Sequence, residues 1–152
     1  MKNFIGGTIG VSTMIAILGL VFLSSLPAVA GTISIDMLNK RADGEKMVYS
    51  QDIVNVKVGD TVTWIPKSKG HNVHFISAPD GISKLPKSKM NKQFSFTFER
   101  AGIYLYQCTP HKAMGMIGVV VVDGNVENKK IVAKTKVFGK SKKKLKKMLG
   151  TL

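Results

Sequence analysis

The most informative stretch of the sequence reads Cys108-Thr109-Pro110-His111-Lys112-Ala113-Met114-Gly115-Met116. It places a thiol, an imidazole and two thioethers within nine residues, and a second imidazole, His71, lies far upstream. Two His, one Cys and a weakly bound Met are the ligands that copper prefers when it cycles between Cu(I) and Cu(II). The stretch therefore predicts a copper site, in which Met114 and Met116 are both candidates for the methionine.

Three other interpretations of these residues fit the sequence less well. A single His or Met is more often an ordinary structural residue, but the close spacing of Cys108, His111 and Met116 has no evident packing reason. Structural zinc usually takes four strong nitrogen or sulfur ligands with two or more cysteines, and this chain has one cysteine. Cys-His nucleophilic catalysis would need an orienting group and an oxyanion hole, for which the sequence offers no candidate. Copper remains the best match.

The N-terminus has the pattern of an export signal. Lys2 precedes an apolar run at residues 14–23, and Ala28-Val29-Ala30 resembles a cleavage site. We expect residues 1–30 to be a cleaved signal peptide and the mature chain to begin at Gly31; an uncleaved anchor is the alternative, but the apolar run is short for a span of about 20 residues. A single cysteine in an exported protein cannot form an internal disulfide, so metal ligation is the natural role of Cys108.

The region from Gly31 to Gly124 has the pattern of a β-sandwich. Apolar residues alternate with polar ones or cluster with β-branched residues, and turn signals separate the segments. At 152 residues, the chain is long enough for one domain with terminal extensions. We predict an all-β, Greek-key sandwich of about eight strands, with strands near residues 33–38, 47–49, 53–58, 61–65, 71–76, 94–98, 103–108 and 117–122 and a long excursion with a helical turn at 77–93.

The last part of the chain has a different pattern. Phe138, Leu145, Met148, Leu149 and Leu152 recur near the helical period with lysines between them. We predict that residues 125–152 form a basic helical extension packed on the sandwich. Membrane-surface contact by this tail is the alternative that we do not favour, and binding of nucleic acid is not expected in an exported protein.

Positive charge is concentrated in that tail. The whole chain carries 23 Lys and Arg against 9 Asp and Glu, a formal net charge of +14. Residues 31–128 hold 12 basic and 9 acidic side chains, whereas residues 129–152 hold 10 Lys and no acid. The sandwich itself is therefore only mildly basic.

Four segments resemble the pseudoazurins, a family of type 1 copper proteins with the cupredoxin fold. The resemblance covers most of the chain from residue 32 onward and is strongest in the ligand loop. The segments are Asp36-Met37-Leu38-Asn39-Lys40, Gly59-Asp60-Thr61-Val62-Thr63-Trp64-Ile65-Pro66, Lys69-Gly70-His71-Asn72-Val73 and Cys108-Thr109-Pro110-His111-Lys112-Ala113-Met114-Gly115-Met116.

The resemblance implies one copper ion per chain, held by His71, Cys108, His111 and, axially, Met116 rather than Met114. It implies that Asn72 and Pro110 lie next to the ligands and tune the site. Partner docking would involve Lys40, Lys69, Lys112 and Met114, within a wider ring that includes Lys67, Lys87 and Lys89. His74 is an additional imidazole, which we expect to be structural rather than a metal ligand.

The function implied by the resemblance is that of a small, monomeric periplasmic carrier of single electrons and not of an enzyme. Transfer would be outer-sphere, through the exposed edge of His111, to a copper nitrite reductase or a c-type cytochrome with an acidic docking face. A protein that stores or delivers Cu(I) with the same ligands is the alternative.

Overall fold

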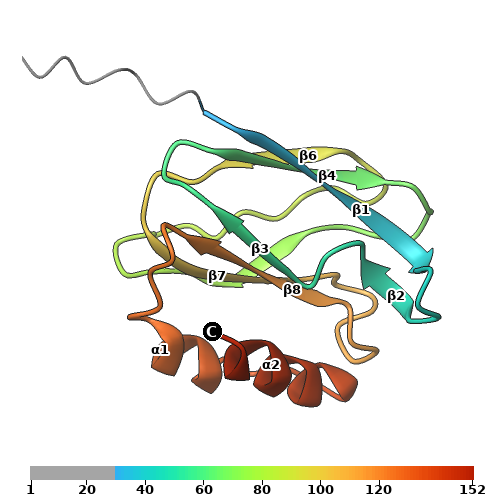
Figure 1. The fold of residues 1–152 in the computed structure, drawn as a ribbon. Helices are drawn as coiled ribbons and strands as arrows, with labels where there is room; N and C mark the ends of the chain where they lie inside the picture. The colour runs from blue at the N-terminus through green and yellow to red at the C-terminus, as the bar shows by residue number, and fades with distance from the viewer. Residues whose placement is uncertain (1–29) are drawn as a thin grey trace, which may run out of the picture.

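The computed structural model describes residues 30–152, so the predicted signal peptide lies, apart from Ala30, outside the described residues. These residues form two four-stranded sheets packed face to face, with two helices below the second sheet (Figure 1). Two strand pairs are parallel, β1 with β4 and β3 with β8, and the other pairs are antiparallel. This arrangement confirms the predicted β-sandwich with a helical extension.

The first sheet has the strand order β2-β1-β4-β6. Its strands are β1 (Thr32–Lys40), β2 (Lys46–Tyr49), β4 (Thr61–Pro66) and β6 (Phe94–Thr97). One face of this sheet points to the core and the other to solvent, which explains why apolar and polar residues alternate along β1 and β4.

The second sheet has the strand order β3-β8-β7-β5. Its strands are β3 (Ile53–Val56), β5 (His74–Ser77), β7 (Gly102–Gln107) and β8 (Ile117–Val122). Every residue of β7 and β8 is buried, because the other sheet covers one face of these strands and the helices cover the other. The continuous apolar sequence of β8 follows from this double burial.

Two hydrophobic cores result. The core between the sheets is rich in aromatic rings, with Trp64 packed edge-on against Phe75 and Tyr106. The second core joins alternate residues of β7 and β8, such as Leu105 and Val119, to the apolar side of the helices.

The helices are α1 (Lys129–Lys134) and α2 (Lys140–Gly150). Leu145, Met148 and Leu149 of α2 are buried against the second sheet, and most lysines of the helix point outward. The apolar stripe of the tail thus packs on the sandwich, as the sequence predicted. Among residues 30–152, no helix has the length and apolar character that a membrane crossing requires.

Two local predictions were wrong. The fifth strand begins at His74 and not at residue 71. The side chain of Asn72 bonds to Thr109 and the backbone of Val73 bonds to Ser88, so these residues do not pair with β7. Residues 78–93 contain turns and an isolated bridge between His74 and Lys87, and no helical turn. Pro79, Gly81 and Pro86 in this segment oppose a helix.

An ion-pair network fastens α2 to the sandwich. The Asp52 carboxylate lies 2.7 Å from Lys144 Nζ and 3.0 Å from Arg41 Nη1. Burial alone would raise the pKa of Asp52, but the hydrogen bonds with Arg41 and Lys144 outweigh burial, so the net pKa lies below its ordinary value. Ionised Asp52 therefore stabilises the folded state.

We predict that Asp52→Asn lowers the free energy of unfolding at neutral pH by roughly 1 kcal/mol, since the Asp52 side chain is 32% exposed and its charge is partly screened. The contribution of a carboxyl with a depressed folded pKa is present above its unfolded pKa of about 3.9 and is lost as the pH falls through the folded pKa. Urea unfolding of both proteins from neutral pH to acid should show the difference shrinking below about pH 4. A difference that is constant across this range would contradict the assignment.

Candidate metal centre

The pairing of β5 with β7 brings the predicted ligands together. His74, the first residue of β5, pairs with Gln107, the last residue of β7. The chain before β5 and the chain after β7 therefore leave the sheet at the same end. His71 lies on the first of these segments, and Cys108 lies on the second.

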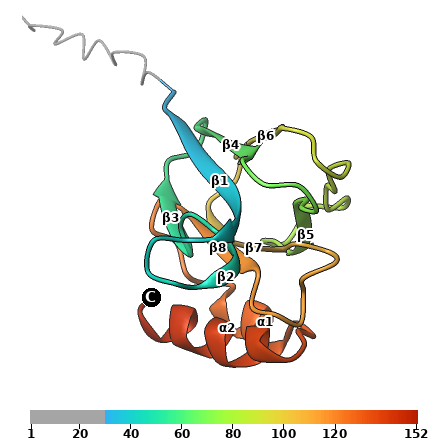
Figure 2. The ribbon, with the colours of Figure 1, turned by 90° about the vertical axis from the view of Figure 1, so that its right-hand side faces the viewer.

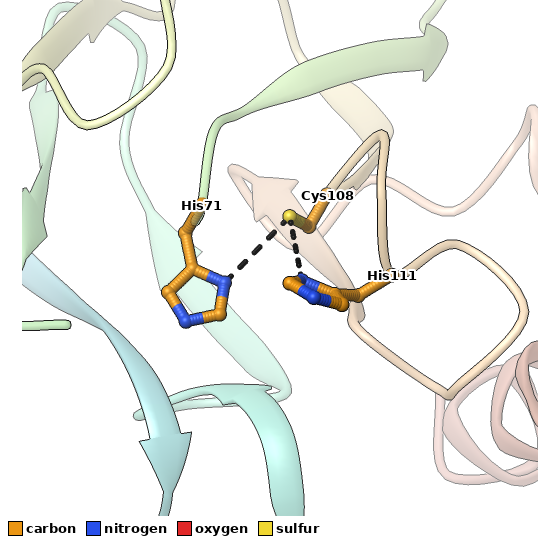
Figure 3. Close-up of side chains that lie close together, drawn as sticks. All are labelled: His71, Cys108 and His111. Carbon is orange, nitrogen blue, oxygen red and sulfur yellow. Dashed lines mark hydrogen bonds between the residues drawn. The ribbon is translucent and has the colours of Figure 1, made fainter. Parts of the chain in front are cut away.

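Three donor atoms converge at this end of the sandwich (Figure 3). Cys108 Sγ lies 3.4 Å from His111 Nδ1 and 3.8 Å from His71 Nδ1. A metal ion with bonds of about 2.0–2.3 Å holds its ligand atoms roughly 3.3–4.0 Å apart in trigonal or tetrahedral geometry. The spacing of the thiol and the two imidazoles thus fits one shared metal ion. His74 lies outside this cluster.

The two candidate methionines differ in burial. Met116 is fully buried in the same core as Cys108, and its carbonyl accepts a hydrogen bond from the Cys108 N–H at 2.9 Å. Met114 is 48% exposed. Of the two, Met116 is therefore the one that is shielded from water in the core that contains Cys108.

The ligand loop is a series of tight turns. The His111 N–H donates to the Cys108 carbonyl at 3.2 Å, and the Met114 N–H donates to the His111 carbonyl at 2.9 Å. Gly115 has a φ of +102°, which few residues with a side chain adopt, and it reverses the chain before Met116. These turns place Cys108, His111 and Met116 on one short loop.

Asn72 joins the two ligand-bearing segments. Its side-chain oxygen accepts a hydrogen bond from the Thr109 N–H at 2.8 Å, and its amide nitrogen donates to Thr109 Oγ1 at 3.2 Å. Its carbonyl accepts a hydrogen bond at 2.8 Å from the hydroxyl of Tyr49, a buried core residue. Asn72 is itself buried, and its bond with Tyr49 lies in the interior.

Asn39 fixes the ring of His71, a role that the sequence analysis did not identify. His71 Nε2 lies 2.8 Å from Asn39 Oδ1. Because an amide oxygen can only accept, Nε2 carries the proton and Nδ1 keeps a free lone pair directed toward Cys108. Asn39 belongs to the segment 36–40 that resembles the pseudoazurins. Only the fold reveals that β1 ends beside His71.

The protonation equilibria favour neutral imidazoles. Burial lowers the pKa of His71, and the nearby His111 lowers it further; burial also lowers the pKa of His111. Burial raises the pKa of the Cys108 thiol, although the backbone N–H groups of Asn72 and His111 oppose that shift. A nucleophilic cysteine needs a lowered pKa, so this environment argues against Cys-His catalysis.

The start of α2 holds the ligand loop from outside. Ser141 Oγ donates to the Lys112 carbonyl at 2.6 Å, and the Lys140 N–H donates to the Ala113 carbonyl at 2.9 Å. A side chain at Gly139 would overlap the Ala113 carbonyl. The tail therefore supports the loop between His111 and Met116, a contact that the sequence did not reveal.

The surface around the loop is basic and partly apolar. Pro110, Lys112 and Met114 are exposed on the ligand loop itself. Lys40 and Lys69, which the resemblance assigned to docking, are also exposed, at the end of β1 and beside His71. Further exposed lysines of the predicted ring are Lys67, Lys87 and Lys89.

Comparison with known proteins identifies relatives over most of the chain. Residues 35–123 match the family described as copper binding proteins of the plastocyanin/azurin family. A putative pseudoazurin from Rhizobium leguminosarum bv. viciae is 37% identical over 124 residues, 80% of each chain. A pseudoazurin from Methylorubrum extorquens is 36% identical over 115 residues, 74% of this chain and 76% of that one.

Solved structures agree with these relatives. The crystal structure of native pseudoazurin from Hyphomicrobium denitrificans superposes with a TM-score of 0.74 at 32% sequence identity. The match covers 80% of this chain and 98% of that one. The similarity thus includes the sandwich and the helical extension.

We predict that Asn72→Ala destabilises the copper-free protein by about 1–3 kcal/mol, because the partly buried Thr109 N–H loses its acceptor. Asn55→Ala, at an exposed position of β3, is the matched control and should change stability by less than about 0.5 kcal/mol. Urea denaturation measures both values. Equal stability of the two variants would contradict the role of Asn72 as the link between the ligand segments.

Proposed function

The chain belongs to the plastocyanin/azurin family of copper-binding proteins, and from this membership we propose that it carries single electrons between redox partners by outer-sphere transfer. The main support for the proposal is that the thiol of Cys108 and the imidazoles of His71 and His111 converge at one end of the sandwich. Copper is the metal of the family. The donor set matches that preference, because a His2Cys set with a weak Met is typical of copper electron-transfer sites.

The proposed ligands are His71 Nδ1, Cys108 Sγ, His111 Nδ1 and the axial Met116 thioether, for one copper ion per chain. When bound there, copper supplies a one-electron cycle between Cu(I) and Cu(II). The burial of Met116 supports its choice over Met114.

The protein favours fast electron transfer by holding the copper ligands rigidly. Asn39 orients the ring of His71, Asn72 ties its segment to Thr109, and α2 supports the loop that carries His111. Hydrogen bonds of this kind keep ligand positions fixed when the charge of a site changes. A small structural change between oxidation states favours electron transfer over bond-making chemistry.

His111 is the proposed exit for the electron. It is the most exposed of the three clustered ligands, and its neighbours along the loop, Pro110, Ala113 and Met114, are apolar and exposed. An apolar patch excludes water when a partner docks, so the ring edge of His111 would meet the partner directly. The patch is small, as expected for a transient contact.

The lysines around this patch are proposed to select an acidic partner, such as a copper nitrite reductase or a c-type cytochrome. Lys40, Lys69 and Lys112 are exposed and come from three separate segments at the same end of the sandwich. A patch of one sign raises the encounter rate with an oppositely charged surface more than it raises affinity.

We also propose that the protein is exported to the periplasm as a monomer and cleaved after Ala30. The support is the three-part signal pattern in residues 1–30. Strand β1 begins at Thr32, so the proposed cleavage would leave the sandwich and its helical extension complete. N-terminal sequencing of the protein from a periplasmic extract would test the position.

Optical spectroscopy tests the proposed function. We predict that the Cu(II)-loaded protein is intensely blue or green, bleaches on reduction and regains its colour on oxidation. A copper-loaded protein that stays colourless after oxidant treatment, or that releases copper readily, would support storage or delivery of Cu(I) and contradict the carrier role.

Two substitutions assign the ligands. Cys108→Ser should abolish the colour, because the thiolate is responsible for the intense absorption of such sites. Met116→Leu should keep most of the colour and change the reduction potential, because the axial ligand tunes it. Met114→Leu is the matched control, and a larger change in potential from this variant than from Met116→Leu would show that the axial assignment is wrong.

Stopped-flow mixing with an acidic redox partner tests the docking face. We predict that the second-order rate constant falls steeply with salt and that the double variant Lys69→Gln/Lys112→Gln slows it by about tenfold at low ionic strength. Lys57→Gln/Lys130→Gln removes the same charge at exposed positions beside the end of β3 and in α1, near the end of the second sheet opposite to Cys108. Equal slowing by both variants, or a flat salt dependence, would contradict steering by the copper end.

A further inference from the structure

The outward side of the helical tail forms a groove that the packing of the tail on the sandwich does not use. It has a volume of about 800 Å³ and lies between α1 and α2. Its apolar lining includes Val137, Leu145 and Leu149, whose other sides contribute to the core, together with the more exposed Phe138.

Lysines surround this apolar floor. Lys134, Lys136, Lys142 and Lys146 are exposed and Lys129 is partly exposed, and all five line the groove. Residues 129–152 contain no acidic residue. Within residues 30–152, the only ion pair of the tail joins Lys144 to Asp52, so the lysines of the groove have no acidic partner there.

Phe138 is the apolar group best placed for an external ligand. It is 38% exposed, and the ammonium groups of Lys112 and Lys136 lie 4.9 Å and 5.6 Å from its ring centre. An aromatic ring between lysines combines an apolar contact with positive charge at one point of the surface. Because Lys112 belongs to the ligand loop, the groove borders the copper end.

We propose that this face of α1 and α2 binds the surface of an anionic phospholipid bilayer. The lysines would contact headgroup phosphates, and the partly exposed ring of Phe138 would contact the upper acyl region. Clusters of exposed lysines attract anionic membrane surfaces in this way. The proposal does not depend on the electron-carrier function.

One feature favours a membrane over an acidic protein as the occupant. Positive charge extends over the whole tail, with 10 Lys and no acidic residue in residues 129–152, and is not confined to one patch. Such a spread of charge suits a laterally uniform anionic surface. Contact would be peripheral, because the apolar stripe of α2 remains packed on the second sheet.

Vesicle co-sedimentation of the chain from Gly31 onward tests the proposal. We expect binding to vesicles of phosphatidylglycerol and phosphatidylcholine and none to phosphatidylcholine alone. Lys142→Gln/Lys146→Gln should weaken binding by about 25-fold, at roughly fivefold for each lysine near the surface.

Lys84→Gln/Lys92→Gln is the matched control, with the same loss of charge in the exposed segment between β5 and β6, away from the helices (Figure 2). It should change binding by less than about twofold, since screening limits the reach of these charges. Equal weakening by both pairs would mean nonspecific attraction and would overturn the proposal, as would absence of binding to the anionic vesicles.

Fluorescence locates the contact. The emission of F138W should shift to the blue on addition of the anionic vesicles, whereas that of V58W, at a 46% exposed position in the turn after β3, should not shift. Soluble polyglutamate serves as the acidic-protein probe. A shift of F138W with polyglutamate and none with vesicles would identify a protein-docking groove and contradict the membrane proposal.

Discussion

The antiparallel register of β5 and β7 is the constraint on which the metal centre depends. Because His74 is paired with Gln107, the segments that carry His71 and Cys108 leave the sheet together, although 36 residues separate them in the sequence. Antiparallel pairing fixes which residues face each other, and a shift of one residue would turn every side chain of the strand to the opposite face. The short loop to β8 then needs only Gly115 and a few turn hydrogen bonds to bring His111 and Met116 to the same place.

The burial of that sheet on both faces explains why the tail matters. Alternate residues of β7 and β8 belong to different cores, so the sheet that carries Cys108 is held between the aromatic core and the helices. The same helices contact the ligand loop through Ser141 and Lys140. The tail thus stabilises the sandwich, supports the ligand loop and leaves its outer surface free for another contact.

The parts of this structure that local patterns determine were predictable from the sequence. Alternation in β1, the apolar run in β8 and the amphipathic tail indicated strands and helices, and the unusual composition of the ligand loop indicated copper. The parts that depend on long-range contacts were not. The pairing of Asn39 with His71, the support of the loop by Ser141 and the start of β5 at His74 all depend on neighbours distant in the sequence. A local pattern contains no information about such neighbours, and the resemblance to a family supplied the choice between Met114 and Met116 that spacing alone left open.

The central claim is that the protein holds one thiolate and two imidazoles in a single arrangement that suits both oxidation states of copper. X-ray absorption spectra of the oxidised and reduced copper-loaded protein test this claim most directly. We predict one short copper–sulfur and two copper–nitrogen bonds in both states, with only small changes in length between them. Loss of a histidine on reduction, or an oxygen ligand in place of the sulfur in the oxidised protein, would contradict it.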